Sequence, residues 1–476
     1  MPEPPGPPAR RRPGRPPAGR RLRWGIVAPR LLGIDVGTTR TKAVLVDPAG
    51  AEAASAARPT PFEAGPAGVE APVEALLATV RAVVGDLGDG VAGVAGVGVA
   101  GLAESGAPLD DAERPLAPVI AWHDPRGAEV VAVLGERFGD GLARRIGQRL
   151  RPVSSVAKLG WQAAAGVGPV RWWLGVPELC LHRLTGARAT DFSLAARTGA
   201  YDVGRRAPLA EVPAALGLPA DVFPQPRPAG TAMGTTSAVG AAWLGVAAGV
   251  PVTVAGHDHL AGAVGAGAGP ADLVNSVGTA ETVVGASDLL PDVGSALDLG
   301  VAVSVRPDGA GWAAVASAAR AGLVIAAAAR ALGRPPADLD ALADGAAATV
   351  DATAWVEALA GTARGRGGGR PGPAPAPPAG APGAVWSGVL HALAARTWEA
   401  ARRAEAVCGR PARMVVVGGG SRSRPWLRAK AAQSDVAVVR STVGEAAARG
   451  AAVHAGVAAG WWQCAAAAPA PPVEPV

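Results

Sequence analysis

Two short segments of the chain combine a carboxylate with small or hydroxyl-bearing residues, and the first of them surrounds Asp35. Asp35 lies two residues before Gly37-Thr38-Thr39, and Lys42 follows three residues after that turn. The glycine lets the backbone approach a phosphate closely, and the threonines add hydroxyl donors. Asp35 could hold Mg²⁺, through water because Mg²⁺ dehydrates reluctantly, and Lys42 could neutralise phosphate charge. The segment suits a phosphate-binding turn, although a plain hairpin is the commoner use of such residues.

The second carboxylate is Asp258, in the run Ala-Gly-His-Asp-His that follows a predicted strand over residues 252–255. Ligands gather at strand ends in α/β folds, and the neighbouring glycine leaves room for a substrate. These features predict that Asp258 is a general base for an attacking hydroxyl. His257 and His259 raise a zinc site as an alternative. Because no Cys or further His lies nearby, we expect a structural role for both histidines.

A third segment, residues 414–424 (MVVVGGGSRSR), runs from apolar strand residues into three glycines. A strand that leads through a Gly-rich turn to a helix N-terminus suits adenosine or its α-phosphate. The spacing does not fit G-x-G-x-x-G, which argues against a dinucleotide fold. The three segments together offer phosphate donors, a metal-holding carboxylate and a base. These are the groups that phosphoryl transfer requires, in a closed and dry cleft.

The elements that must position these groups are short strands and Ala-rich helices. Residues 31–47 predict strand, turn and strand, residues 94–100 a further strand, and residues 73–84 a helix, which indicates an α/β chain. The Val-Gly-Thr of this first turn recurs 241 residues later, again between β-rich segments. The repeat predicts a duplicated domain, with two phosphate-facing hairpins opposed across a cleft.

The charge of the chain is concentrated at its N-terminus. Residues 1–30 carry a net charge of +7 against a total of +6, which leaves −1 for residues 31–476. We expect a disordered Pro/Arg-rich tail rather than a nucleic-acid partner. The tail lacks the apolar core of a signal peptide, and no long apolar run follows it, so we expect a cytoplasmic protein without a membrane partner. Three scattered cysteines form neither a disulfide framework nor a metal spacing.

Taken in order, the motifs resemble those of the FGGY family of carbohydrate kinases, which includes glycerol kinase, xylulokinase and gluconokinase. The similarity runs from residue 31 to about residue 460, through DVGTTRTK, AWHDPRG, LTGARATDFSLAARTGAYD, PVTVAGHDHLAGAVGAG, NSVGTAE, VVVGGGSRS and EAAARGAAVHA. The resemblance implies two ribonuclease-H-like domains of the actin and sugar-kinase superfamily, with ATP and sugar in the cleft between them.

That resemblance also assigns expected roles. Asp35 would hold Mg²⁺, and Asp258 would take the proton of the sugar hydroxyl. The residues expected along ATP and its phosphates are Gly37, Thr38, Thr39, Lys42, Gly278, Thr279, Gly322, Gly419, Gly420 and Arg424. Those expected on the sugar side, besides Asp258, are Glu104, Trp122, Asp124 and Arg126.

The expected organisation has four parts. Residues 1–30 form the tail, 31–250 an N-terminal kinase domain with the sugar side and first hairpin, 251–462 a C-terminal domain with the base and nucleotide side, and 463–476 an Ala/Pro tail. A low-complexity Pro/Gly loop is expected over residues 363–384. The stretch 283–384 is the least family-like, and damage there could lower activity without abolishing the fold.

Departures from the family pattern bear on the substrate. Glycerol kinase has an Arg-Glu pair where this chain has Ala103-Glu104, and the Met-His-Gly of xylulokinases is absent. Glycerol and xylulose therefore lose support, although Glu104 could still bind a hydroxyl. For Trp122 the alternative is core packing, and for Asp124 it is capping of the helix that follows Pro125.

The sequence thus predicts an ATP-dependent kinase that phosphorylates a hydroxyl of a small sugar, sugar acid or polyol, most of all a pentulose or hexulose. A sugar sensor of the same superfamily that transfers no phosphate is one alternative, and an ATPase of the chaperone or filament type is another. Retention of Asp35, Thr38 and Asp258 favours the kinase, because a binding module needs no base. The sequence names neither the sugar nor the oligomeric state, and it leaves a homodimer open.

Overall fold

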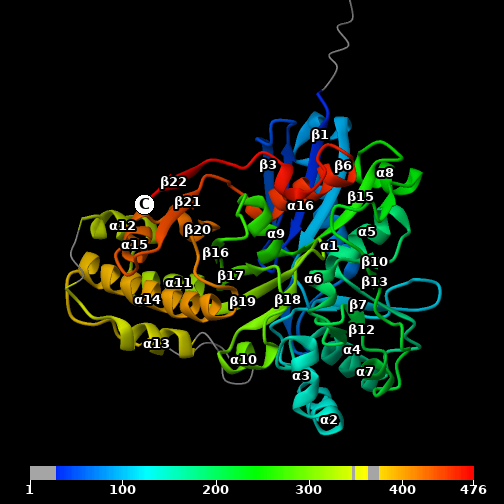
Figure 1. Cartoon of the computed structure of the whole chain (residues 1–476), viewed down its shortest axis with the longest axis horizontal. Helices are drawn as coiled ribbons and strands as arrows, with labels where there is room; N and C mark the ends of the chain where they lie inside the picture. Colours follow the sequence, from blue (N-terminus) through cyan, green and yellow to red (C-terminus); the bar gives the residue numbers. More distant parts are fainter. Residues whose placement is uncertain (1–27, 346–348, 363–374) are drawn as a thin grey trace, which may run out of the picture.

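The protein contains two large mixed sheets with helices packed around them (Figure 1). The computed structural model describes residues 28–345, 349–362 and 375–476. The predicted N-terminal tail lies outside the described residues except for residues 28–30. Residues 363–374 of the predicted low-complexity loop lie outside them too. Of the rest of that loop, residues 375–381 have no regular structure, and a helix begins at Pro382.

The first sheet is built around the predicted strand-turn-strand. Its order is β14 (Gly234–Thr235), β15 (Pro251–His257), β6 (Val94–Gly101), β1 (Arg30–Val36), β2 (Arg40–Val46) and β3 (Glu52–Pro59). Strands β1, β6 and β15 run parallel, and β2 and β3 continue the sheet antiparallel. The parallel strands read as near-continuous apolar runs because helices cover them.

The second sheet repeats this order. It runs β18 (Ala302–Val305), β19 (Trp312–Ala319), β17 (Glu281–Ser287), β16 (Asp272–Val277), β20 (Arg413–Val417), β21 (Ala437–Ser441) and β22 (Val473–Pro475). Strands β16, β20 and β21 are parallel, while β17 and β19 are antiparallel to their neighbours. Strand β16 thus corresponds to β1, and β17 to β2, so the α/β duplication that the repeated Val-Gly-Thr predicted is present.

Helices pack against both sheets. Those associated with the first sheet include α1 (Val73–Gly85), α5 (Val176–Thr185), α8 (Ala238–Leu244), α9 (Asp258–Gly265) and α16 (Ala446–Ala458). The second sheet is covered by the long α14 (Pro382–Cys408), with α11 (Ala321–Ala331), α12 (Pro336–Ala343), α13 (Thr353–Thr362) and α15 (Arg424–Ala431) around it. Each sheet has its own large apolar core, in which valine, leucine and alanine predominate.

Smaller elements join these layers. The helices are α2 (Ala128–Phe138), α3 (Asp140–Ile146), α4 (Ser155–Ala164), α6 (Phe192–Ala195), α7 (Glu211–Ala214) and α10 (Val293–Asp298), with 3₁₀ turns η1 (Gly88–Gly93), η3 (Gly419–Arg422) and η4 (Ala465–Ala467). The short strands are β4 (Glu63–Gly65), β5 (Gly68–Ala71), β7 (Gly106–Leu109), β8 (Val119–Ile120), β9 (Trp172–Gly175), β10 (Ala189–Thr190), β11 (Tyr201–Asp202), β12 (Ala207–Pro208) and β13 (Gln225–Pro226).

Helix α16 returns from the end of the chain to the first sheet, where it packs on β1, β6 and α9 (Figure 1). The approach is close because small residues face each other. A Cβ atom added to Gly33 of β1 would lie 2.6 Å from the backbone nitrogen of Ala452, and one added to Gly265 of α9 would lie 2.7 Å from that of Gly450. Any side chain at these glycines would push the helix off the sheet.

The predicted border between residues 250 and 251 does not coincide with the border between the sheets. Strand β15, which begins at Pro251, pairs with β6 in the first sheet. Helix α16 also packs on that sheet, although it lies near the C-terminus. The layer around the first sheet therefore combines residues from both predicted domains, and it places Asp258 beside the first turn rather than in a separate half of the molecule.

The C-terminal Ala/Pro segment, predicted as a tail over 463–476, is attached to the second sheet. Its strand β22 pairs antiparallel with β21. The buried guanidinium of Arg449 in α16 donates to the carbonyl oxygens of Pro469 (2.7 Å), Gly265 (2.7 Å) and Gly50 (2.9 Å). Within the described ranges, no helix is both long and apolar enough to cross a bilayer.

Candidate active site

The two Gly-Thr turns of the duplicated sheets meet each other. Gly37 N–H donates to the carbonyl of Arg40 (3.1 Å) in the β1–β2 turn, and Gly278 N–H donates to the carbonyl of Ala280 (3.0 Å) in the β16–β17 turn. The hydroxyls of Thr39 and Thr279, which are 240 residues apart, lie 3.3 Å from one another. The structure therefore brings the predicted phosphate-facing residues of both turns to one place.

Asp35 lies just before the first turn, at the buried end of β1. Its side chain is 6 % exposed, and Oδ1 has no hydrogen-bond partner among the described residues. Burial raises the pKa of Asp35 to about 7, Lys42 opposes that rise, and the negative charge of Asp258 adds to it. The Nζ atom of Lys42, the cross-strand neighbour of Asp35, lies 3.9 Å from Oδ2. Asp35 thus offers a buried oxygen to which no donor is bonded.

Lys42 is shared between two carboxylates. Its Nζ lies 2.7 Å from Oε2 of Glu445, the residue that precedes the first turn of α16. Burial alone would lower the pKa of Lys42, but the carboxylates of Asp35 and Glu445 outweigh burial and raise it. Lys42 is therefore a fixed cation beside Asp35. Its predicted contact with phosphate stays a prediction.

Asp258 is the first residue of α9, directly after β15. The backbone N–H of His259 donates to Oδ1 (2.7 Å), and Nε2 of His257 lies 3.2 Å from the same oxygen. Burial would raise the pKa of Asp258, but His259, His257 and the His259 backbone N–H outweigh burial and lower it. The carboxylate is consequently ionised at neutral pH, at a helix N-terminus that favours negative charge.

The two histidines are tied into the protein. His259 Nδ1 lies 3.1 Å from Ser276 Oγ and its Nε2 lies 3.4 Å from Thr282 Oγ1, so its ring reaches both strands of the second turn. Burial lowers the pKa of His257 to about 3. One ligand atom each from His257, Asp258 and His259 fits within 4.8 Å, so the zinc alternative keeps a geometric basis. The hydrogen bonds of His259 are those of the structural role that we expect.

Trp122 contacts the first turn directly. Its indole N–H donates to Oγ1 of Thr38 over 2.8 Å, and the ring is only half-buried. The side chain therefore supports the phosphate turn, which core packing alone does not require.

Asp124 and Arg126 bind each other in a largely buried network. Arg126 Nε donates to Asp124 Oδ1 (2.8 Å), and Arg126 Nη1 donates to Glu70 (3.1 Å). The backbone N–H of Val69 donates to Asp124 Oδ2 (2.7 Å). Helix α2 begins after Gly127 without a side-chain cap, so Asp124 is not the cap that the sequence left open. The network holds the loop that presents Trp122.

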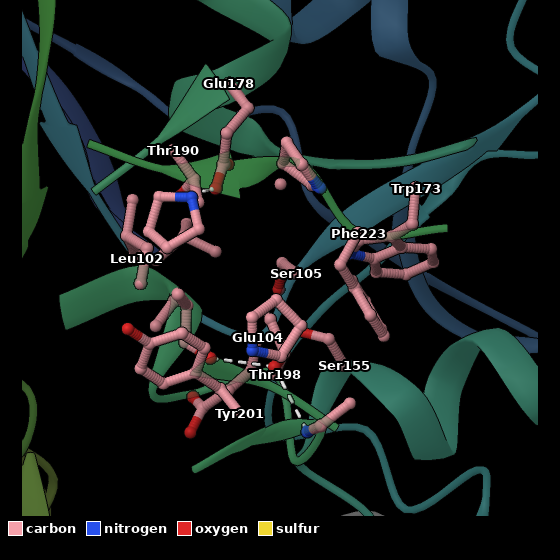
Figure 2. Close-up of a pocket in the computed structure, with 18 residues that line it drawn as sticks. Leu102, Glu104, Ser105, Ser155, Trp173, Glu178, Thr190, Thr198, Tyr201 and Phe223 are labelled. Carbon is pink, nitrogen blue, oxygen red and sulfur yellow. Dashed lines mark hydrogen bonds between the residues drawn. The ribbon is translucent and has the colours of Figure 1, made fainter. Parts of the chain in front are cut away.

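Glu104 has the arginine partner that the sequence seemed to lack at position 103. Arg197 Nε donates to Glu104 Oε1 (2.8 Å), and Nη2 of the same arginine donates to that oxygen as well. Glu104 has a φ of 69°, which is uncommon for a residue with a side chain and marks a constrained backbone. Glu104 also lines a cavity together with Ser105, Trp173 and Glu178 (Figure 2).

The predicted nucleotide-side glycines lie behind the second turn. A Cβ atom on Gly322, in the first turn of α11, would lie 2.5 Å from the carbonyl oxygen of Gly278. Gly419 and Gly420 form η3 after β20, and Arg424 is the exposed first residue of α15. Gly322 and Gly420 thus lie against the second turn, and the predicted contacts of these residues with ATP stay predictions.

Three residues of this site were not predicted. Glu445 and Arg197 lie within motifs that the sequence comparison had singled out, but their ion pairs join segments far apart in the chain. Gly418 has a φ of 89°, and a Cβ atom there would lie 2.6 Å from the carbonyl oxygen of Val277. The three-glycine run signalled a close approach without showing which glycine makes it.

Comparison with known proteins places the chain among sugar kinases. Residues 30–265 match the N-terminal domain of the FGGY family of carbohydrate kinases. An L-fuculokinase of Escherichia coli is 34% identical over 191 residues, which cover 38% of this chain and 39% of that enzyme. A xylulose kinase of Streptomyces rubiginosus is 28% identical over 269 residues, 55% of each chain. The chain thus spans about two fifths of the L-fuculokinase it matches.

The fold comparison extends over nearly the whole chain. The crystal structure of a xylulose kinase from Rhodospirillum rubrum has a TM-score of 0.76 and 25% identity, and the match covers 94% of this chain and 93% of that one. The two similar sheets, the meeting turns and the match over residues 30–265 agree with one another. Residues 30–265 of this protein form an N-terminal domain of the FGGY family of carbohydrate kinases, and the chain has the two-domain α/β fold of the actin and sugar-kinase superfamily.

Proposed function

We propose that this protein transfers the γ-phosphate of ATP to a hydroxyl of a small sugar, with Asp258 as the base. The observation that supports this proposal most is the position of two carboxylates beside the first turn. Asp35 is buried and Asp258 is half-buried, and they lie close enough for their negative charges to repel each other. Like charges are unfavourable in a site shielded from water unless a cation or a proton joins them there. Functional sites are where such arrangements are found.

The residues around Asp35 fit a Mg²⁺ ion. Oδ1 of Asp35 is buried and unpartnered among the described residues, and a carboxylate oxygen is a ligand that Mg²⁺ prefers. A bound Mg²⁺ would neutralise charge on the transferring phosphate. Asp35 would hold it, and Lys42 would keep the Asp35 carboxylate in place. The Gly37 and Gly278 turns, with Thr38, would donate to the phosphates.

Asp258 suits the role of base because its carboxylate is ionised and fixed. Oδ1 is occupied by the His259 backbone N–H and by His257, which leaves Oδ2 to accept the proton of the sugar hydroxyl. In a loose phosphoryl-transfer transition state the hydroxyl proton leaves late, so a carboxylate of low pKa is sufficient. The contribution of Asp258 is mainly positional, and the helix N-terminus favours its negative form before transfer.

The test is a substrate panel. Purified protein with Mg-ATP is given pentuloses, hexuloses, polyols and aldonic acids, and ADP release and phosphosugar formation are both measured. We expect sugar-dependent ADP release that requires Mg²⁺, with one phosphosugar formed per ADP. Binding of each sugar without ATP is measured in parallel by calorimetry.

The other outcomes identify the alternatives. ADP release that no panel member alters would indicate an ATPase. Sugar binding without any turnover would indicate a sugar sensor, and it would contradict the assignment of Asp258 as a working base.

A further inference from the structure

A cavity lies beside Glu104, the residue expected on the sugar side, and its other lining residues have no assigned role in the proposed reaction. Its walls come from the loop after β6, from β9, from α5 and α6, and from residues 223–226 (Figure 2). Its volume is about 30 Å³, which is room for one or two water-sized groups and too little for a sugar ring. Trp173 and Phe223 form one side, while Glu178 and Thr190 lie at the other, joined by a hydrogen bond (Figure 2).

Polar atoms without a partner line this small space. Ser105 is 1 % exposed and Glu178 is 5 % exposed, and neither Ser105 Oγ nor Glu178 Oε2 has a hydrogen-bond partner among the described residues. The other oxygen of Glu178 accepts from Thr190 Oγ1 over 2.5 Å. A buried polar atom without a partner is unfavourable, because it has lost its hydrogen bonds to water without replacement. The hydroxyl of Tyr201, which also lines the cavity, has no partner among the described residues either, and these three unpaired atoms indicate that a polar group fills the cavity.

The cavity adjoins the reaction centre on two sides. The backbone N–H of Leu102, which lines the cavity, donates to the carbonyl oxygen of Val36 (2.9 Å), the residue before the first phosphate turn. Leu194 lines the cavity on another side, and its neighbour Ser193 accepts a hydrogen bond from the backbone N–H of His257 (2.9 Å). These two contacts connect the cavity wall to the first turn and to the residue before Asp258, which is why we expect one end of a bound sugar at this cavity.

The lining favours a neutral group. None of the 18 described residues that line the cavity is Lys, Arg or His, and two of them, Glu104 and Glu178, carry carboxyl groups. The guanidinium of Arg197 lies nearby, but it is bonded to Glu104. Burial raises the pKa of Glu178, so its carboxyl group is biased toward the protonated form, which can both donate and accept. A carboxylate in the cavity would contact the carboxyl groups of Glu104 and Glu178 and no cation among the described lining residues.

We infer that this cavity receives the terminal hydroxymethyl group of a neutral acceptor sugar, at the end remote from the phosphorylated hydroxyl. A hydroxyl can pair with Ser105 and Glu178 at once, a methyl group leaves both unpaired, and a carboxylate adds an unbalanced charge. The inference rests on the proposed kinase function and narrows its substrate class to neutral ketoses or polyols over aldonic acids.

The experiment compares three forms of the best sugar from the panel: the parent, its terminal deoxy analogue and its terminal carboxylate analogue. For the wild type we expect kcat/KM to fall roughly tenfold or more for the deoxy analogue, and further for the carboxylate, because the site's polar atoms are left unpaired. Ser105→Ala should reduce the preference for hydroxymethyl over methyl to within about threefold. Glu178→Gln should narrow the discrimination against the carboxylate.

Ser154→Ala is the matched control. Ser154 is also buried, with an Oγ that lacks a partner among the described residues, but it does not line the cavity, so this variant should keep the wild-type preference. Thermal unfolding and calorimetric binding of the sugar without ATP verify that each variant is folded and separate binding from turnover.

The outcomes separate the two proposals. If the parent and deoxy sugars were phosphorylated with equal kcat/KM, or if Ser105→Ala kept the wild-type preference, this inference alone would be overturned. The cavity would then hold ordered water instead of the sugar. A panel with neither turnover nor sugar binding overturns both the inference and the proposed function.

Discussion

The two Gly-Thr turns occupy equivalent positions in the two sheets, yet the carboxylates beside them have different hydrogen-bond partners. Asp35, before the first turn, has one oxygen without a partner among the described residues and a lysine 3.9 Å from the other. Glu281, directly after the second turn, is fully buried. Its Oε1 accepts from Lys430 (2.5 Å), Asn275 (3.0 Å) and Thr397 (2.7 Å), while its Oε2, like Asp35 Oδ1, has no partner among the described residues.

The surroundings of the two carboxylates indicate that the second turn has a supporting role, whereas the first turn has a chemical one. Lys430 is buried with its carboxylate and also donates to Asn275, so the second turn is supported by a buried polar network beside the apolar core. The first turn stands on a carboxylate whose lysine is turned toward Glu445. The two carboxylates therefore differ in their lysines. A fully buried lysine ties Glu281 into a network that supports the second turn, whereas the lysine beside Asp35 is shared with Glu445 and leaves Asp35 less constrained.

Breaking the second network should have the largest effect on stability. Lys430→Met leaves Glu281 as an unpaired buried charge, and we expect a loss of about 3–5 kcal/mol in the free energy of unfolding. Lys42→Met removes the lysine beside Asp35 at the first turn, which is 29 % exposed, and should cost about 1 kcal/mol or less. Urea unfolding of both variants measures the difference.

The double variant Lys430→Met with Glu281→Met is the control, because removing both charges together should recover much of the stability lost by Lys430→Met alone. Equal losses for Lys430→Met and Lys42→Met would contradict the division into a supporting turn and a chemical one.

Removing the proposed base should have the next largest effect, and we expect it to change the catalytic rate rather than ATP binding. Asp258→Asn should lower kcat by about 10²-fold or more while leaving ATP binding nearly unchanged, because a base acts mainly in the transition state. Asp272→Asn is the matched control from the second sheet, since Asp272 is a buried carboxylate paired with Arg413. If Asp258→Asn were as active as the wild type, Asp258 would lose the role of base.

Much of this fold could be predicted because its signals are local. The strand-turn-strand at residues 31–47, the strand at 94–100 and the helix at 73–84 appear within a residue or two of where their patterns place them. The repeated Val-Gly-Thr revealed the duplication because equivalent turns need the same small residues. The sheet membership of β15 and α16 was missed, since which layer an apolar segment joins depends on packing partners far away in the sequence.

The site followed the same rule. Residues inside a motif, such as Asp35 and Asp258, could be proposed as site residues from spacing and residue type. Arg197 could not be predicted as the partner of Glu104, because the two residues are 93 positions apart in the sequence. The glycerol kinase pattern places an arginine at the adjacent position, where this chain has Ala103. Local sequence can show that a partner is missing at one position, but it cannot show which distant side chain fills the gap.

The charge state of Asp35 gives a pH-dependent test of the difference between the two turns. Its pKa is raised to about 7 in the folded protein against about 3.8 when exposed, so the stability that its proton contributes is present below about pH 4 and is lost as pH rises through 7. Without Mg²⁺, the wild type should lose on the order of 2 kcal/mol more unfolding free energy between pH 5 and 8 than Asp35→Asn. Mg²⁺ at pH 8 should reduce that gap. Parallel stability curves for the two proteins would show that Asp35 is ionised throughout.

The smallest effect is expected from the indole that supports the first turn. Trp122→Phe removes the N–H that donates to Thr38, and the loss of one hydrogen bond of about 1 kcal/mol should lower kcat/KM for ATP about fivefold. Trp312→Phe is the control, because its indole N–H donates to the Val203 carbonyl (2.9 Å) at the second sheet, away from either turn. Steady-state kinetics with varied ATP compare the two. If Trp312→Phe lowered kcat/KM as much, the effect would come from general packing, and Trp122 would lose its specific link to the phosphate turn.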